Sequence, residues 1–201
     1  MKLAGFILTI VLIPNLLFAK GEGSLKNVIG INTLETTNNH IGIGVYYERF
    51  VAKNGKLSVV LPLSIGWEMG TIAKTTGALS LEPRTALFIN PGIKFYPMGN
   101  SKFFTYSVGL SGFAHGGEST QIYGQVEVPS NGKGYDYHFQ VAGILLNNYL
   151  NFKISKSLSF GLEVGFGPTF INNYKVKNEP LLVKGGAMVY QNLAFQVAYR
   201  F

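Results

Sequence analysis

The last nine residues of the chain alternate strictly between apolar side chains and small or polar ones. The apolar positions are Leu193, Phe195, Val197, Tyr199 and Phe201. The intervening positions are Ala194, Gln196, Ala198 and Arg200. A period of two predicts a β-strand, because successive side chains of a strand point to opposite faces. The tail therefore predicts a strand with one apolar, largely aromatic face.

The same alternation recurs along most of the chain. It predicts eight strands, at about residues 27–35, 41–51, 56–68, 85–97, 102–114, 137–154, 158–170 and 183–201. The clearest is 56–68, whose apolar face is Leu57, Val59, Leu61, Leu63, Ile65 and Trp67. Pro62 lies on its other face and lacks a backbone donor, so we expect a bulge or a locally broken hydrogen bond there. The facing of 137–154 is left open by the pattern.

The connections between these strands fall into two classes. Tight turns are predicted near 53–55, 98–101 and 155–157, and longer loops at 69–84, 115–136 and 172–182. With eight up-and-down strands, the tight turns all lie at one end, where aromatic residues also gather. Strands that cross a bilayer at a tilt need about 9–11 residues. This asymmetry is typical of a transmembrane β-barrel with short turns on one side and long loops on the other.

Composition distinguishes this fold from its main rival. Apolar residues make up 47% of the chain and charged residues 13%, about half the charged fraction of a soluble domain. A soluble β-sandwich or lipocalin-like barrel would also alternate, but its outward face would be polar. Here an aliphatic face recurs beside a small, Gly-rich one, which favours an antiparallel, all-β, eight-stranded transmembrane barrel.

The first residues predict an export signal. Lys2 is followed by an apolar run from Leu3 to Phe18 and by Ala19 at the expected cleavage point. This order of a charged, an apolar and a small-residue region is that of a secretory signal peptide. The run is shorter than the ~20 residues of a spanning helix, and a retained anchor is the alternative. We therefore expect a cleaved signal at 1–19 and one barrel domain at 20–201.

The whole chain after the signal resembles the small eight-stranded outer-membrane β-barrels of bacteria, such as the transmembrane domain of outer-membrane protein A and outer-membrane protein X. The tail carries the sharpest resemblance, through Leu193, Phe195, Val197, Tyr199 and Phe201. In that family such residues form a signal for the barrel-assembly machinery, and the resemblance implies that role here. It also implies a monomer in the bacterial outer membrane, surrounded by lipid and lipopolysaccharide.

Charged residues on the inward faces predict a polar network in the lumen. They are Glu48, Glu68, Lys94, Glu163 and Arg200. Burying such charges unpaired is costly, so we expect Glu48 or Glu163 to pair with Lys94 or Arg200. Eight strands enclose a lumen that side chains can fill. The preferred interpretation is a filled structural interior, the alternative is a narrow ion channel, and an open porin is disfavoured.

Other chemistry is weakly supported. The chain has no Cys, which excludes disulfides and thiolate metal sites. Its net charge of +7 does not indicate nucleic acid binding in an exported protein, because most of the lysines fall in predicted turns and loops. We expect neither a cofactor nor a metal.

A lipid A-modifying enzyme is the remaining alternative. The three histidines, His40, His115 and His138, are predicted at external strand ends, where such residues are usually solvated. Glu118 and Ser119 follow His115, but the spacing matches no nucleophile motif. The sequence therefore predicts no enzyme, and it assigns any partner binding to the external loops 69–84 and 115–136.

Overall fold

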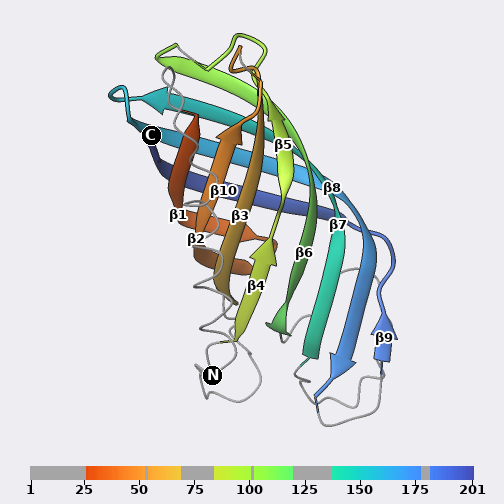
Figure 1. Ribbon diagram of the computed structural model, residues 1–201. Coiled ribbons are helices and arrows are strands. Elements are labelled where there is room, and N and C mark those ends of the chain that lie inside the picture. Colours follow the sequence, from red (N-terminus) through yellow and green to blue (C-terminus); the bar gives the residue numbers. More distant parts are fainter. Residues whose placement is uncertain (1–25, 53, 69–83, 101, 120–136, 178–181) are drawn as a thin grey trace.

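The computed structural model describes residues 26–52, 54–68, 84–100, 102–119, 137–177 and 182–201 (Figure 1). The predicted signal at 1–19 lies outside these ranges. The strands are β1 (Asn27–Thr37), β2 (His40–Phe50), β3 (Leu57–Glu68), β4 (Thr85–Ile89), β5 (Gly92–Phe95), β6 (Phe104–Ser119), β7 (Tyr137–Lys153), β8 (Leu158–Val176), β9 (Leu182–Lys184) and β10 (Val189–Arg200). In these ranges there is no helix of the length and apolarity that a membrane crossing requires.

The strands form one antiparallel sheet that closes on itself. From β1 to β4 and from β5 to β9, each strand pairs with the next along the chain, and β1 and β8 both pair with β10, which completes the ring. β4 and β5 both pair with β3 and with β6, so together they occupy one position in the ring. β9 only extends the β8 edge. In the described part of the chain the ring therefore has eight positions, which confirms the predicted up-and-down barrel.

The outside of the barrel is apolar, as the alternation predicts. Exposed positions include Ile31, Val45, Leu57, Leu61, Ile65, Trp67, Leu87, Ile93, Leu110, Phe160, Phe166, Phe195 and Tyr199. The alternate positions of the same strands, such as Ser58, Lys94 and Gln196, are buried. Contiguous apolar surface on this scale is not tolerated in water, whereas a closed sheet satisfies its backbone within hydrocarbon. The exterior therefore faces lipid.

Two strand predictions concern prolines, and one of them needs correction. We expected one strand at 85–97, but it is interrupted at Asn90–Pro91 between β4 and β5. At Pro62 the sequence predicted either a bulge or a locally broken hydrogen bond. β3 pairs with β2 through Pro62 without a change of register, so there is no bulge on that side. The ladder between β3 and the β4–β5 pair is interrupted there, which confirms the second alternative, and Asn90 N donates to Pro62 O at 3.4 Å. Proline has no backbone N–H to donate, and the interruption appears in the facing strand, as the break between β4 and β5.

The loop end was predicted less well than the turn end. We name as the turn end the one that carries connections 51–56, 96–103 and 154–157, and as the loop end the opposite one. At the loop end β6 and β8 continue to Ser119 and Val176, beyond the predicted strand ends at 114 and 170. The predicted loop 172–182 is wrong over 172–176. The predicted strand 183–201 is divided into β9 and β10, although Gly185 and Met188 keep backbone bonds to β8.

Substituting an exterior residue tests which face meets lipid. Val45 lies midway along β2 and is exposed, so Val45→Arg should lower the free energy of unfolding by about 2–4 kcal/mol. Val51→Arg, just past β2 at the turn end, is the matched control and should cost about 0–1 kcal/mol. Urea unfolding in lipid vesicles, followed by the fluorescence of the single tryptophan, Trp67, measures both. Equal losses for the two variants would contradict a lipid-facing β2.

Candidate functional site: the filled interior of the barrel

The interior has two layers of different chemistry. Toward the turn end, charged and hydroxyl side chains from β2, β3, β5, β7 and β8 meet in the lumen. Toward the loop end, aromatic and aliphatic side chains from β4, β6, β7, β8 and β10 form one buried cluster. We call these the polar layer and the aromatic layer. We expected a polar interior throughout, and the aromatic layer corrects that expectation.

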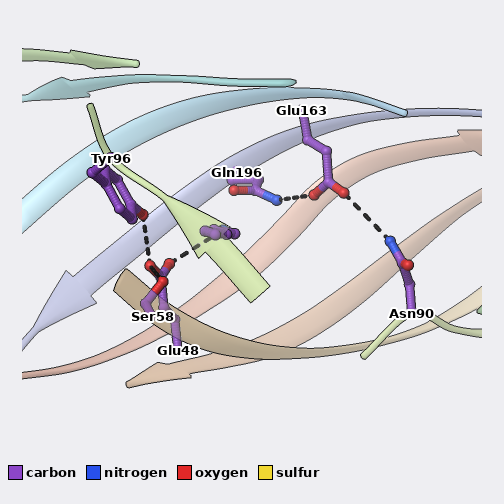
Figure 2. A network of polar contacts seen from close by, with 7 residues as sticks. Glu48, Ser58, Asn90, Tyr96, Glu163 and Gln196 are labelled. Atoms are coloured by element: carbon purple, nitrogen blue, oxygen red, sulfur yellow. Dashed lines mark hydrogen bonds and ion pairs between the residues drawn. The ribbon is translucent and has the colours of Figure 1, made fainter. Parts of the chain in front are cut away.

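Glu48 on β2 is the centre of the polar layer (Figure 2). Its Oε1 accepts hydrogen bonds from Ser58 Oγ and from Tyr96 Oη, each at 2.6 Å. Its Oε2 receives Lys94 Nζ at 3.2 Å. The side chain is 3% exposed. Three donors on one buried carboxylate stabilise its ionised form, because they replace the water that burial removes.

Lys94 on β5 is held on the opposite side by aromatic rings. Its Nζ lies 3.9 Å from the centroid of the Tyr149 ring and 5.3 Å from that of Tyr46. Ammonium groups are attracted to the electron-rich face of such rings, most strongly when water is excluded. Lys94 is 1% exposed, so the ion pair and the ring contacts together replace its hydration.

Glu163 on β8 lies on the opposite wall of the lumen (Figure 2). Its Oε2 accepts from Gln196 Nε2 on β10 at 2.7 Å. Its Oε1 receives Asn90 Nδ2 at 3.5 Å, a long contact that reaches across from the break between β4 and β5. Through these two amide donors, Glu163 connects β8 to its neighbour β10 and to the break between β4 and β5 on the other side of the lumen.

Glu35 is a buried carboxylate that the sequence reasoning missed. The pairings of β1 change register between Asn32 and Glu35. Such a bulge reverses the facing of the residues beyond it, so Leu34 points outward and Glu35 inward. Its Oε2 accepts from Asn32 Nδ2 at 2.8 Å and from Ser64 Oγ. A regular strand would have put Glu35 on the lipid face, and that conflict was the signal available in the sequence.

Arg200 lies apart from these carboxylates, at the turn end. Its Nη1 donates to Asn100 O at 3.3 Å, and its guanidinium lies 4.9 Å from the centroid of the Phe50 ring. Among the described residues it forms no ion pair with Glu48 or Glu163. The structure thus brings Glu48 and Lys94 together, and leaves Arg200 to close the turn end.

The aromatic layer contains two of the three histidines. His40 and His115 are 1% and 3% exposed, and their ring centroids lie 5.0 Å apart in an edge-to-face arrangement. His115 Nδ1 and Tyr190 Oη share a hydrogen bond of 2.6 Å. We expected solvated histidines, which is wrong for these two and correct for His138, whose side chain is 52% exposed. The strands are longer than predicted at this end, so the histidines lie inside the barrel.

The residues of the possible Ser–His–Glu cluster are directed to different partners. Ser119 Oγ donates to Glu68 Oε1 at 2.6 Å. Glu118 lies on the other face of β6, where its Oε1 is 3.8 Å from His138 Nδ1 and 3.7 Å from Lys177 Nζ. A triad needs nucleophile, base and carboxylate in one chain of hydrogen bonds. Within the described residues, no group of three or more possible metal-ligating side chains is present either.

Side chains from several strands meet inside the described part of the barrel. A cavity of about 20 Å³ lies at the turn end, lined by residues that include Glu48, Tyr96, Lys153 and Arg200. This is space for one water molecule. In the aromatic layer, Phe88, Phe113 and Tyr190 are in ring contact across the lumen, with centroids 4.3–6.0 Å apart. The arrangement can bind the strands to one another through contacts across the lumen.

The tail residues of the proposed assembly signal lie on the exterior of β10. Phe195, Tyr199 and Phe201 are exposed, and Leu193 and Val197 are half-buried. Their rings and side chains are directed to lipid and not to the lumen. Their role in assembly stays a prediction.

Comparison with known proteins establishes the fold. No family model matches the chain, and no curated protein matches its sequence. Among solved structures, a major outer membrane protein from Thermus thermophilus superposes with a TM-score of 0.57 at 11% identity, over 88% of this chain and 98% of that one. Neisserial surface protein A superposes with a TM-score of 0.51 at 11% identity, over 90% of this chain and all of that one. The chain has the fold of the small bacterial outer-membrane β-barrels. The apolar exterior of the barrel agrees with that likeness.

Breaking the central ion pair tests the polar layer. Lys94→Met leaves Glu48 as a buried charge without its cation, and should lower the free energy of unfolding by about 3–5 kcal/mol. Adding Glu48→Gln removes the charge while keeping an acceptor for Ser58 and Tyr96, so the double variant should regain most of that loss. Urea unfolding in vesicles measures both. A double variant no more stable than Lys94→Met would contradict this account.

Removing one hydroxyl tests the aromatic layer. Tyr190→Phe deletes the partner of His115 and leaves a buried ring nitrogen unsatisfied, which should cost about 1–3 kcal/mol. His115→Phe in the same chain removes that nitrogen, so the double variant should be more stable than Tyr190→Phe alone. Thermal unfolding in detergent micelles gives the order of the two midpoints. The reverse order would show that the His115–Tyr190 bond contributes nothing.

Proposed function

We propose that this chain is a non-enzymatic outer-membrane barrel with a sealed interior, which acts through its outer surface and external loops. The observation that carries the proposal is the packing of the lumen. In the polar layer Lys94 contacts both Glu48 and the Tyr149 ring, and in the aromatic layer the rings of Phe88, Phe113 and Tyr190 contact one another. An interior bound in this way stabilises the barrel and leaves the outer surface for interaction.

The narrow-channel alternative is supported less well. A channel needs a continuous path whose polar groups exchange between protein and water. Here the carboxylate of Glu48 is saturated by protein donors, and the second layer is lined with rings. The enzyme alternative needs Ser119 to be free for activation, but its hydroxyl is engaged by Glu68.

The loops that the sequence reasoning assigned to partner binding, 69–84 and 115–136, lie mostly outside the described residues. Of the comparison proteins, one is named as a surface protein, and a surface role in this chain is part of the proposal. The orientation, with the turn end in the periplasm, follows from the same proposal.

Planar bilayer recording tests the sealed interior. The wild-type barrel should show no stable conductance steps, because no aqueous path crosses the two layers. Lys94→Ala combined with Tyr149→Ala opens the polar layer and serves as a comparison, with folding verified by gel migration without heating. Discrete steps from the wild-type barrel, at any salt concentration, would overturn the proposal.

Mass analysis of lipid A from cells with and without the protein provides the second arm. The spectra should be identical for a barrel that modifies no lipid. A new deacylated or acylated species that disappears with Ser119→Ala would replace the proposal with an enzyme.

A further inference from the structure

A groove runs along the lipid-facing side of β6, β7 and β8. Three adjoining hollows form it, with volumes of about 380, 370 and 420 Å³. The first two share Ile89, Ala114, Ala142 and Ile171, and the second and third share Gly116 and Gln140. The hollows are therefore one continuous groove that leads toward the loop end.

Small residues make the floor of this groove. On β6 the outward positions change from Tyr106, Val108 and Leu110 to Gly112, Ala114 and Gly116 toward the loop end. Ala114 lies opposite Ala142 in the β6–β7 ladder. Most of the exterior elsewhere carries large side chains, so these four small residues leave a depression in an otherwise filled apolar surface.

The walls of the groove come from the neighbouring strands. Leu87, Ile89 and Pro91 line one side. On the other side, β8 has a register shift opposite Ala142 and Gly143, where Phe170 and Ile171 both point outward, with exposures of 69% and 48%. The irregularity in β8 thus raises an apolar wall beside the small floor. A slot of this shape fits a flexible hydrocarbon chain better than a flat protein surface.

The end of the groove is cationic. His138 and Lys175 are cross-strand partners and line the hollow nearest the loop end, together with Gln140 and Asn173. Lys177 directly follows the last residue of β8, and it shares Glu118 with His138. Lys175 has no ion-pair partner among the described residues, and two lysines face one carboxylate here. The site therefore has excess positive charge where apolar lining gives way to polar side chains.

We infer that this groove binds one acyl chain of lipid A, with a phosphate of its headgroup at Lys175 and Lys177. An apolar slot that ends at ammonium groups in excess over carboxylates matches a ligand with a hydrocarbon tail and an anionic head. The inference rests on the proposed function, because it requires the loop end to lie in the outer leaflet, where lipopolysaccharide supplies that chemistry. The inference concerns binding alone, and the lipid is not chemically changed.

Filling the slot is the first test. A Cβ on Gly112 would meet no atom within 4 Å, so Gly112→Leu projects into the groove without disturbing the sheet. Retention of bisphosphorylated lipid A by the purified barrel, measured by native mass spectrometry, should fall at least about fivefold. Val45→Leu adds apolar bulk on β2, across the barrel, and should retain lipid as the wild type does.

Removing the charge is the second test. Lys175→Ala should weaken retention of bisphosphorylated lipid A about tenfold, the loss of one charge-assisted contact. It should leave dephosphorylated lipid A unaffected, and Lys156→Ala at the turn end should change neither. Wild-type retention by both Gly112→Leu and Lys175→Ala would overturn the inference, as would equal retention of phosphatidylglycerol.

Other occupants give distinct results. A dimer in micelles that Gly112→Leu abolishes would assign the groove to a second copy of this chain and would also overturn the inference. None of these outcomes bears on conductance or on lipid A modification. Failure of the groove and failure of the proposed sealed barrel are therefore separable.

Discussion

The structure depends on the closure of the sheet between its first and last strands. In hydrocarbon, a backbone N–H or C=O without a partner costs several kcal/mol, so a spanning sheet must have no free edge. Here β1 pairs with β10 along its length, and Asn27 and Phe201 exchange two backbone hydrogen bonds of 3.1 and 2.9 Å. Once the ring is closed, the size of the lumen is fixed, and the interior side chains must fill a space of that size.

Glycines adjust that space to the large polar residues of the interior. A Cβ on Gly30 would lie 2.2 Å from the Tyr46 ring, and one on Gly109 would lie 3.0 Å from the Tyr149 ring. These two rings are the ones that flank Lys94. The missing side chains on β1 and β6 thus allow the tyrosines to lie flat in the lumen. The small, Gly-rich face of the alternating pattern is what allows a buried lysine to be surrounded.

Alternation predicted the facing of β2, β3, β5, β10 and the first part of β8 well, because in a strand without bulges every second residue stays on the same face. Glu48, Lys94 and Glu163 could be assigned to the interior for that reason alone. Glu35 was missed, because the bulge after Asn32 reverses which face the following residues occupy, and the only sign of it in the sequence is a charged residue at a position that a regular strand would expose to lipid. The paired outward residues Phe170 and Ile171 have the same origin. Where the ladder loses register, the period of two no longer identifies a face.

Residue types also failed to show where the strands end. His40 and His115 were predicted at external strand ends, where a histidine is usually solvated, yet both strands run past the predicted boundaries and both side chains are buried in the aromatic layer. A strand end can be polar in sequence and still have a histidine packed among rings, because one face of a barrel strand points into the lumen and the other points outward.

The sequence by itself determined that this chain forms a closed barrel with an apolar exterior and buried charges, since both follow from a period of two and a low charged fraction. Only the tertiary structure decided which charges meet. Glu48 and Lys94 are 46 residues apart in the chain, and their contact depends on the register of three strands, which local pattern does not encode. The groove on β6 to β8 also depends on the tertiary structure, because the residues of its floor and walls come from different strands. The register of the strand pairing decides which of those residues lie side by side.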